Sequence, residues 1–227
     1  MWGRSPHGES AQPALPWPVV CRIGPLLVAC AALLVPGCVT GDRPTLAESV
    51  STTGDPSVDA VLGRLDASRL ATFTATYDVL TRFGNLTNPA AVVQAAADRR
   101  SVTVGTVRFI FDGPTTATCL LDTGTCSDTI DAGQISDTQL APDFYGSSAA
   151  ARLRHEAGAR VGATTGSTQE IAGQVATCVS VPVTGSTSVY CALDDGLLAR
   201  LDAADVAIEL TAYSPDPDEQ QFARRAG

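Results

Sequence analysis

Cysteine is the residue type in this chain with the most chemistry to offer, because a thiol can pair with another, bind a metal or carry a lipid. An even number of cysteines in an exported domain predicts disulfide bonds, and four cysteines allow three pairings. Three of the cysteines lie near the N-terminus and four lie in a region of alternating apolar and polar residues. The seven are Cys21, Cys30, Cys38, Cys119, Cys126, Cys178 and Cys191.

Hairpin register favours one of the three pairings of the later cysteines. Directly opposed residues in an antiparallel hairpin have positions with a constant sum, and their side chains are close enough for a disulfide. Cys178 and Cys191 centre on the turn at 184–185, and Cys119 and Cys126 centre in the same way on an Asp-Thr-Gly turn. We therefore expect the pairs 119–126 and 178–191, which leaves these thiols unavailable for a metal site.

Residues for acid–base or nucleophilic catalysis are scarce. His155 is the only histidine after the N-terminal region, and no G-x-S-x-G sequence accompanies it. It could act as a general base, but its arginine-rich surroundings favour a solvated helix residue. The acidic groups Asp194-Asp195-Gly196 and 216–219 lack the spacing of a calcium loop. We expect no catalytic residue, no metal and no cofactor.

An uncharged apolar stretch from Ile23 to Val35 follows the basic residues Arg4 and Arg22. A membrane-spanning helix needs about 20 apolar residues, so this stretch is too short to cross a bilayer. Its length and its flanking charges are typical of a secretory signal. Residues 1–37 are therefore predicted to be a signal peptide.

The sequence Val35-Pro36-Gly37-Cys38 resembles the lipobox of bacterial lipoproteins, in which the cysteine receives diacylglycerol. Pro36 departs from the small residue usual at its position. The alternative is an ordinary signal peptide with an unmodified Cys38. We favour lipidation of Cys38, because it accounts for the odd cysteine, and expect an anchor on the extracytoplasmic face of the cell membrane. Residues 38–54, which are polar, are predicted to be a flexible tether.

The composition limits the partners. The formal net charge is −9, and all fifteen basic residues are arginine. Nucleic-acid binding depends on a basic patch or stripe, so no nucleic-acid partner is expected. The hydrophobic content of 44% supplies a core, and 227 residues suggest one domain.

The periodicity of the chain predicts an α+β domain at 55–214. A helix begins at Asp55-Pro56, and the sequence from Phe73 to Val79 alternates apolar and polar residues as a half-buried strand does. Further strands are predicted at 104–111, 115–121, from 125, and at 172–183, 186–193, 197–201 and 206–213, with a helix at 147–161. The polar residues 215–227 are predicted to be a disordered tail.

The predicted strands share one apolar face, which helices must cover. Complete cover would give an ordinary core, and incomplete cover would leave a groove for an apolar ligand. The candidates for the lining of such a cavity are Phe73, Tyr77, Val79, Phe109, Phe111, Val179, Val206, Ile208 and Leu210.

The later strands carry a family resemblance. The sequences "IAGQVATCVSV" (171–181) and "VYCALDDGLLARL" (189–201) place Gly173, then Tyr190-Cys191, then Asp195-Gly196-Leu197 and Arg200. This order resembles the exported lipoproteins of the LolA/LppX-like superfamily, and the version with cysteines resembles actinobacterial lipoproteins. The resemblance implies a half-barrel, in which a strongly curved antiparallel sheet holds helices on its concave face. It also implies, for some members, that a lipid or lipidated ligand binds between sheet and helices.

Two functions follow as expectations. The first is a membrane-anchored, extracytoplasmic lipoprotein that binds or carries a lipid or another apolar ligand. The second is a regulatory or scaffold module that binds an envelope protein partner. An enzyme ranks last, since it would need acidic residues that the sequence does not bring together.

Overall fold

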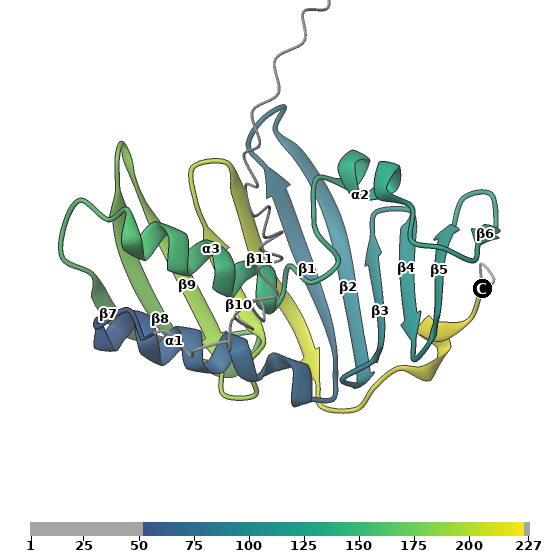
Figure 1. The fold of residues 1–227 in the computed structure, drawn as a ribbon, viewed down its shortest axis with the longest axis horizontal. Helices are drawn as coiled ribbons and strands as arrows, with labels where there is room; N and C mark the ends of the chain where they lie inside the picture. Colours follow the sequence, from purple (N-terminus) through teal and green to yellow (C-terminus); the bar gives the residue numbers. More distant parts are fainter. Residues whose placement is uncertain (1–51, 225–227) are drawn as a thin grey trace, which may run out of the picture. The chain divides into compact units, whose positions relative to one another are not determined.

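The computed structural model describes residues 52–224, which form one open antiparallel sheet covered by helices (Figure 1). The eleven strands lie in the order β6-β5-β4-β3-β2-β1-β11-β10-β9-β8-β7. This confirms the predicted fold class. The strands are β1 (Phe73–Thr81), β2 (Leu86–Ala96), β3 (Arg99–Val104), β4 (Val107–Asp112), β5 (Thr115–Leu120), β6 (Thr125–Ser127), β7 (Thr165–Ile171), β8 (Gln174–Val183), β9 (Ser186–Leu193), β10 (Leu198–Asp202) and β11 (Val206–Ser214).

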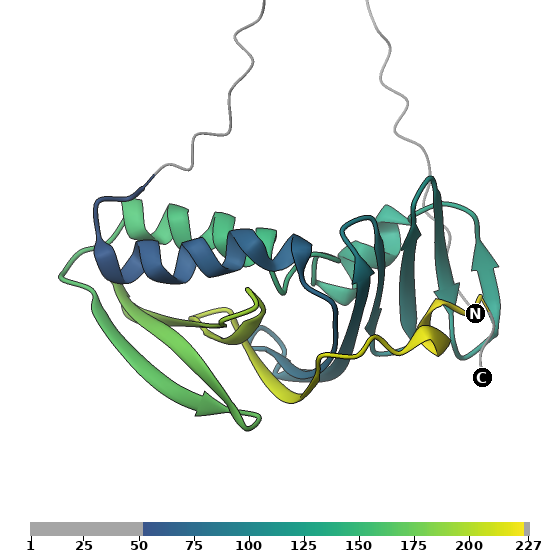
Figure 2. The same cartoon turned by 90° about the horizontal axis from the view of Figure 1, so that it is seen from below.

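Two long helices lie side by side across the concave side of the sheet, which bends around them (Figure 2). They are α1 (Pro56–Ala67), followed by the 3-10 turn η1 (Ser68–Leu70), and α3 (Ser147–Gly158). Asp55 caps α1 by accepting from the backbone N–H groups of Ser57 and Val58, as its position before a proline predicts. The remaining helices are α2 (Ala132–Thr138) and η2 (Glu219–Phe222).

Two meanders build the sheet, and the antiparallel pair β1–β11 joins them. Tyr77 pairs with Leu210 and Val79 with Ile208 across this junction. Paired residues lie on the same face of a sheet, and residues two apart on a strand share that face. By this register the nine candidate lining residues all lie on the concave face.

The core between the two long helices and β7–β11 is made of fully buried side chains. Helix α1 buries the four apolar residues that its periodicity predicts, and α3 buries Leu153 and Ala157. Tyr77 and Tyr190 are among the largest fully buried side chains. Gly196 joins β9 to β10 against the end of α1, where a Cβ would lie 2.4 Å from the carbonyl oxygen of Arg64. Only glycine permits this approach, and its φ of +94° is also unfavourable for other residues.

Both disulfide bonds form as the register predicts. Cys119 bonds to Cys126 between β5 and β6, and Cys178 bonds to Cys191 between β8 and β9. Each pair is directly opposed in its hairpin. The second bond is buried, with Cys178 1% and Cys191 0% exposed, whereas Cys126 of the first is exposed.

The C-terminal segment corrects one prediction. Residues 215–224, expected to be disordered, instead run beside β2 and β3. Arg99 pairs with Glu219, and Ser101 donates a hydrogen bond to the carbonyl oxygen of Gln221 at 2.8 Å. Phe222 packs on the convex face against Ile110, Ala117 and Cys119. The segment therefore docks through one aromatic side chain together with polar contacts to β1 and β3.

Three strands, β2, β3 and β7, were missing from the sequence prediction. The strand predicted at 104–111 starts at the last residue of β3 and crosses the turn at Gly105, so only its later part is a strand, β4. Strand β2 contains Pro89 and an alanine-rich run without alternation, and β7 is a polar edge strand with five exposed residues among its seven. The predicted signal peptide and Cys38 lie outside the described residues. Of the predicted tether, only 52–54 are described, and there Thr53 donates its backbone N–H and its hydroxyl to Asp59.

Candidate functional site

A cavity of about 370 Å³ opens at one end of the concave face, and we call it the apolar pocket. Its volume lies within the range of about 300–1,000 Å³ that is typical of small-molecule sites. Apolar side chains dominate its wall, and a few polar groups lie at its edge. The apolar lining residues are Phe83, Leu140, Ala141, Phe144, Ala149, Leu201, Val206 and Ile208, and the polar ones are Thr81, Gln139, Ser148, Arg152 and Asp205.

Three elements build the walls of the pocket. The paired ends of β1 and β11 supply one wall, where Thr81 lies opposite Val206. The first half of α3 supplies a second, because Ser148, Ala149 and Arg152 fall on one side of the helix. The segment 139–145, between α2 and α3, supplies the third.

Aromatic packing and a hydrogen bond at its C-terminal end hold the segment 139–145 in place. Phe144 packs edge-on against Tyr77 with ring centroids 5.1 Å apart, and Tyr145 packs in the same way on Phe73 at 5.6 Å. The Tyr145 hydroxyl donates to Gln94 Oε1 at 2.9 Å, and Gln94 Nε2 donates to the carbonyl oxygens of Ser68 and Ala71. Burial raises the pKa of Tyr145 to about 12, so its hydroxyl remains a donor at neutral pH.

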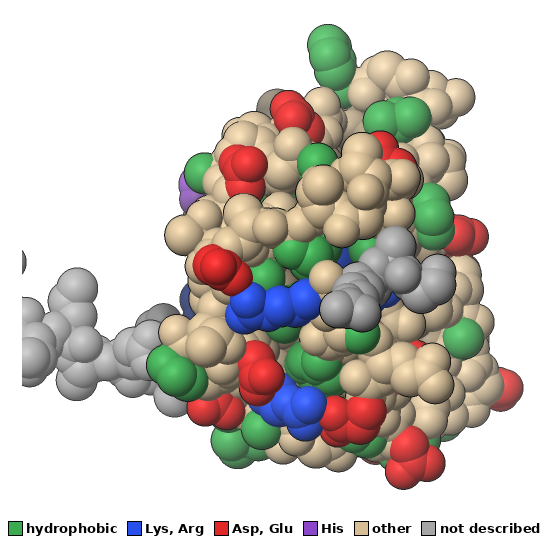
Figure 3. Space-filling model, turned by 90° about the vertical axis from the view of Figure 1, so that its right-hand side faces the viewer, with side chains coloured by type: hydrophobic (Ala, Val, Ile, Leu, Met, Phe, Trp, Pro, Cys, Tyr) green, Lys and Arg blue, Asp and Glu red, His purple; other side chains and the backbone are tan. Residues whose placement is uncertain are grey.

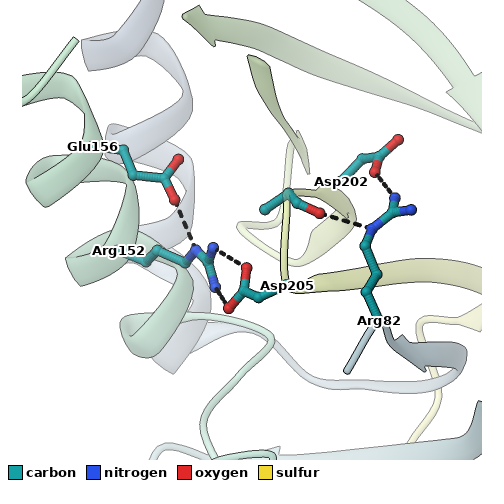
Figure 4. A network of polar contacts seen from close by, with 6 residues as sticks. Arg82, Arg152, Glu156, Asp202 and Asp205 are labelled. Atoms are coloured by element: carbon teal, nitrogen blue, oxygen red, sulfur yellow. Dashed lines mark hydrogen bonds and ion pairs between the residues drawn. The ribbon is translucent and has the colours of Figure 1, made fainter. Parts of the chain in front are cut away.

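Arg152 fixes the rim of the pocket by joining α3 to the β10–β11 turn (Figure 4). Its Nε donates to Glu156 Oε1 at 2.9 Å, and its two terminal nitrogens bind the carboxylate of Asp205. This bidentate pairing lowers the pKa of Asp205 below its usual range. Burial, reinforced by the nearby Glu156, raises the pKa of Tyr190 beneath the network.

Arg82 holds the same turn from the other side. Its Nε donates to the carbonyl oxygen of Ala203 at 2.8 Å, and its guanidinium pairs with Asp202 (Figure 4). The backbone N–H of Arg82 also donates to the carbonyl oxygen of Asp205 at 2.8 Å. The rim of the pocket is thus a set of short polar contacts around an apolar interior.

Exposed apolar side chains stand beside the opening. Phe83, in the β1–β2 turn, is 87% exposed, and Leu86 at the start of β2 is 54% exposed. The turn is shaped by Gly84 and Asn85, which both have positive φ angles. Covering a side chain as apolar as Phe83 with a ligand or a partner is favourable, because it removes apolar surface from water. Elsewhere, on the β6 side, apolar side chains are dispersed among acidic and polar ones (Figure 3).

The structure separates the nine candidate lining residues into three groups. Val206 and Ile208 line the apolar pocket. Phe111 is partly buried beneath the guanidinium of Arg100, which lies 4.2 Å from its ring centroid. The rest are buried side chains of the sheet face, at most 3% exposed: Phe73, Tyr77, Val79, Phe109, Val179 and Leu210.

Other candidate groups lie apart from the pocket. His155 is exposed on α3 and does not line it. Among residues 52–224, no group of three or more His, Cys, Asp or Glu side chains is placed to hold a metal ion.

Sequence patterns missed several residues of the pocket. Leu140, Phe144 and the rim pair Arg152–Asp205 belong to segments without a clear period or lie far apart in the chain. Phe83 left a usable signal, because an aromatic residue inside a Gly-Asn turn has no core to enter.

Within the described part of the chain, no helix is long and apolar enough to cross a membrane. The fold and the pocket together define an α+β protein with an open, curved antiparallel sheet and a small apolar cavity. No protein-family model and no curated protein matches the chain.

Several solved structures resemble the fold. The crystal structure of MucB matches with a TM-score of 0.46 and 17% identity, over 75% of this chain and 63% of MucB. The Pseudomonas aeruginosa MucA/MucB complex gives 0.43 and 14% identity, over 74% and 60%. A DUF1329 family protein from Desulfovibrio piger gives 0.28 and 10% identity, over 74% and 98%. The chain thus spans about three fifths of the MucB chains. These TM-scores are all below 0.5 and show no more than a broad likeness of fold.

Proposed function

We propose that this chain is a membrane-anchored, extracytoplasmic lipoprotein that binds a lipid chain or another apolar ligand in the apolar pocket. The observation that carries the proposal is the pocket itself, a cavity of about 370 Å³ with a predominantly apolar wall beside the exposed Phe83. Water in such a cavity has few hydrogen-bond partners, so an apolar ligand that displaces it is favoured. The proposed role is binding without catalysis.

Binding of an uncharged apolar fluorophore, N-phenyl-1-naphthylamine, tests the pocket directly. The wild-type protein should enhance its fluorescence with saturation at one site. Ala141→Phe places a large side chain in the cavity and should abolish saturable binding, and Phe83→Ser should weaken it. Leu70→Ser is the matched control, because Leu70 is 84% exposed but does not line the pocket.

The outcome that contradicts the proposal is saturable binding by Ala141→Phe with the wild-type affinity. Mass spectrometry of the protein purified from its own host adds an independent arm, in which a co-purifying lipid should be present in the wild type and lost in Ala141→Phe. A correctly folded Ala141→Phe, judged by an unchanged circular dichroism spectrum, makes these comparisons valid.

The membrane anchor is a separate part of the proposal and rests on the lipobox-like sequence that ends at Cys38. Cys38→Ser removes the only thiol that this sequence could modify. The variant should move from the membrane fraction to the soluble fraction. If Cys38→Ser still fractionates with membranes, the anchor is not a lipid at Cys38.

One observation favours the second candidate function, binding of an envelope protein partner. Phe83 and Leu86 form an exposed apolar pair beside the pocket, which an apolar segment of a partner could cover. A photo-crosslinking residue at position 83 should then capture a protein in cells, and the same residue at position 70 should not. Capture of lipid alone at position 83 supports the first function instead.

A further inference from the structure

Two arginines differ from the other arginines of residues 52–224. The guanidinium groups of Arg69, on η1, and Arg100, on β3, make no hydrogen bond and no ion pair with another residue described there. Every other arginine in this part of the chain donates at least one hydrogen bond to a side chain or to a backbone carbonyl. In a chain of net charge −9, two unpaired guanidiniums are not explained by a shortage of carboxylates.

Both arginines line the same small cavity, which we call the arginine pocket. It has a volume of about 70 Å³ and is lined by Ser68, Arg69, Gln94, Ala97, Arg100, Asp143, Tyr145, Gly146 and Ser147. The segment 139–149 separates it from the apolar pocket, since Phe144 lines one and Tyr145 the other. The two cavities are therefore distinct sites.

The Nε atom of Arg100 is buried and has no hydrogen-bond partner. The guanidinium is held in place by the ring of Phe111, which it covers at 4.2 Å from the centroid. A buried N–H of a charged group without an acceptor costs free energy, so such groups are almost always satisfied by a ligand or by water. The position of Arg100 is thus fixed while its donor remains free.

The other groups around the arginine pocket fit a negative charge. Gly146 and Ser147, at the start of α3, line the cavity, and no side chain caps this helix, so its positive dipole end lies at the cavity wall. The backbone N–H groups of Gly146 and Ser148 already donate to the carbonyl oxygen of Asp143. Asp143 is the one carboxylate of the wall, and its two oxygens accept from the hydroxyls of Ser147 and Ser148. Two guanidiniums against one carboxylate leave one net positive charge.

We propose that the arginine pocket is a binding site for one anionic group, a carboxylate or a phosphate, held by Arg69 and Arg100. The cavity is too small for a whole ligand of ordinary size, so it takes either a free small anion or the anionic end of a longer molecule. Arg100 supplies a fixed donor and Arg69, which is exposed, closes over the anion from η1. The site is independent of the apolar pocket, and failure of that proposal leaves this one intact.

NMR titration of the full mature chain with inorganic phosphate, and separately with hexyl phosphate, tests the site through the arginine Nε–H signals. Phosphate should shift the Nε–H signal of Arg100 with saturation. Arg69→Gln and Arg100→Gln should each weaken the affinity by at least about tenfold, the loss expected for one charge-assisted hydrogen bond. Tighter binding of hexyl phosphate would identify the end of an amphiphile, and equal binding a free anion.

Arg154→Gln is the matched control. Arg154 pairs with Asp66 outside both pockets, so this variant removes the same charge and should bind phosphate as the wild type does. Arg69→Gln keeps the test decisive if Arg100→Gln unfolds, because Arg69 is exposed and makes no structural contact with a carboxylate. Phosphate binding that is equal in Arg69→Gln and Arg154→Gln, or no shift of the Arg100 signal with either ligand, overturns the proposal.

Discussion

The two halves of the sheet carry the same alternation of apolar and polar residues but are covered in different ways. The half formed by β7–β11 lies under two helices of twelve residues each, α1 and α3. The half formed by β2–β6 has only α2 and coil near its concave face, and α2 has no buried residue. Its convex face is covered instead by the C-terminal segment around Phe222.

This difference shows that the alternation of apolar and polar residues along a strand determines which face must be covered. It does not determine which element covers that face. Most of the β7–β11 half became a closed core, whereas the apolar pocket and the arginine pocket lie beside residues 139–149, the segment that leads into the first turn of α3. Both pockets thus lie where the part of the sheet under the two long helices meets the part covered by α2 and coil.

The largest expected effect is the loss of a buried side chain under the long helices. Leu153→Ala should lower the free energy of unfolding by about 2–5 kcal/mol, since Leu153 is fully buried on α3. Ile135→Ala on α2 is the matched change and should cost less than about 1 kcal/mol, because Ile135 is only partly buried. Urea denaturation measures both. Equal losses would show that the two halves are equally covered.

The second largest effect is expected at the disulfide bonds, which should differ in the stability they contribute and in the ease of their reduction. Removing the 178–191 bond with a Cys178→Ala/Cys191→Ala variant should cost about 3 kcal/mol, and removing the 119–126 bond slightly less because its loop is shorter. Reductant should open the 119–126 bond first under native conditions, since Cys126 is exposed and the other bond is buried. Mass spectrometry after timed alkylation reports the order, and simultaneous opening would contradict the comparison.

Phe222→Ala tests the cover on the convex face. Phe222 is partly buried and lies 4.3 Å below the guanidinium of Arg99, so its loss should cost about 1–2 kcal/mol. Proteolysis should then remove the C-terminal segment before the rest of the domain unfolds. Leu70→Ala, at an exposed site, should change stability by less than about 0.5 kcal/mol. A Phe222→Ala variant that resists proteolysis as the wild type does would mean that the segment docks by its polar contacts.

The smallest effect is expected at the rim of the apolar pocket. Arg152 lowers the folded-state pKa of Asp205 below its unfolded value, so the stabilisation is present above about pH 4 and is lost as the pH falls through the folded pKa. Asp205→Asn should therefore reduce stability by less than about 1 kcal/mol at pH 7, because the carboxylate is mostly exposed. The difference from the wild type should therefore shrink as the pH falls below about 4. Thermal unfolding across this pH range measures it, and a difference that grows on acidification would contradict the assignment.

The sequence by itself determined much of the secondary structure, both disulfide pairs and the face of the sheet on which the nine candidate residues lie. These features depend on local spacing: a proline after an aspartate begins α1, a period of two defines β1, and a constant sum of positions aligns Cys178 with Cys191. Strands β2, β3 and β7 were not predicted in this way. Strands β2 and β7 lack a local pattern, and pairing with neighbouring strands stabilises them.

The tertiary structure alone decided where the apolar face remains open. Val206 and Phe73 have the same place in the sequence pattern, yet Val206 lines a pocket and Phe73 is sealed by Tyr145. The joining of Arg152 to Asp205 and the meeting of Arg69 with Arg100 likewise depend on elements far apart in the chain. Which element covers a sheet face, and which distant side chains meet, depends on how the packed elements contact one another. A periodicity that extends over a few residues carries no information about such contacts.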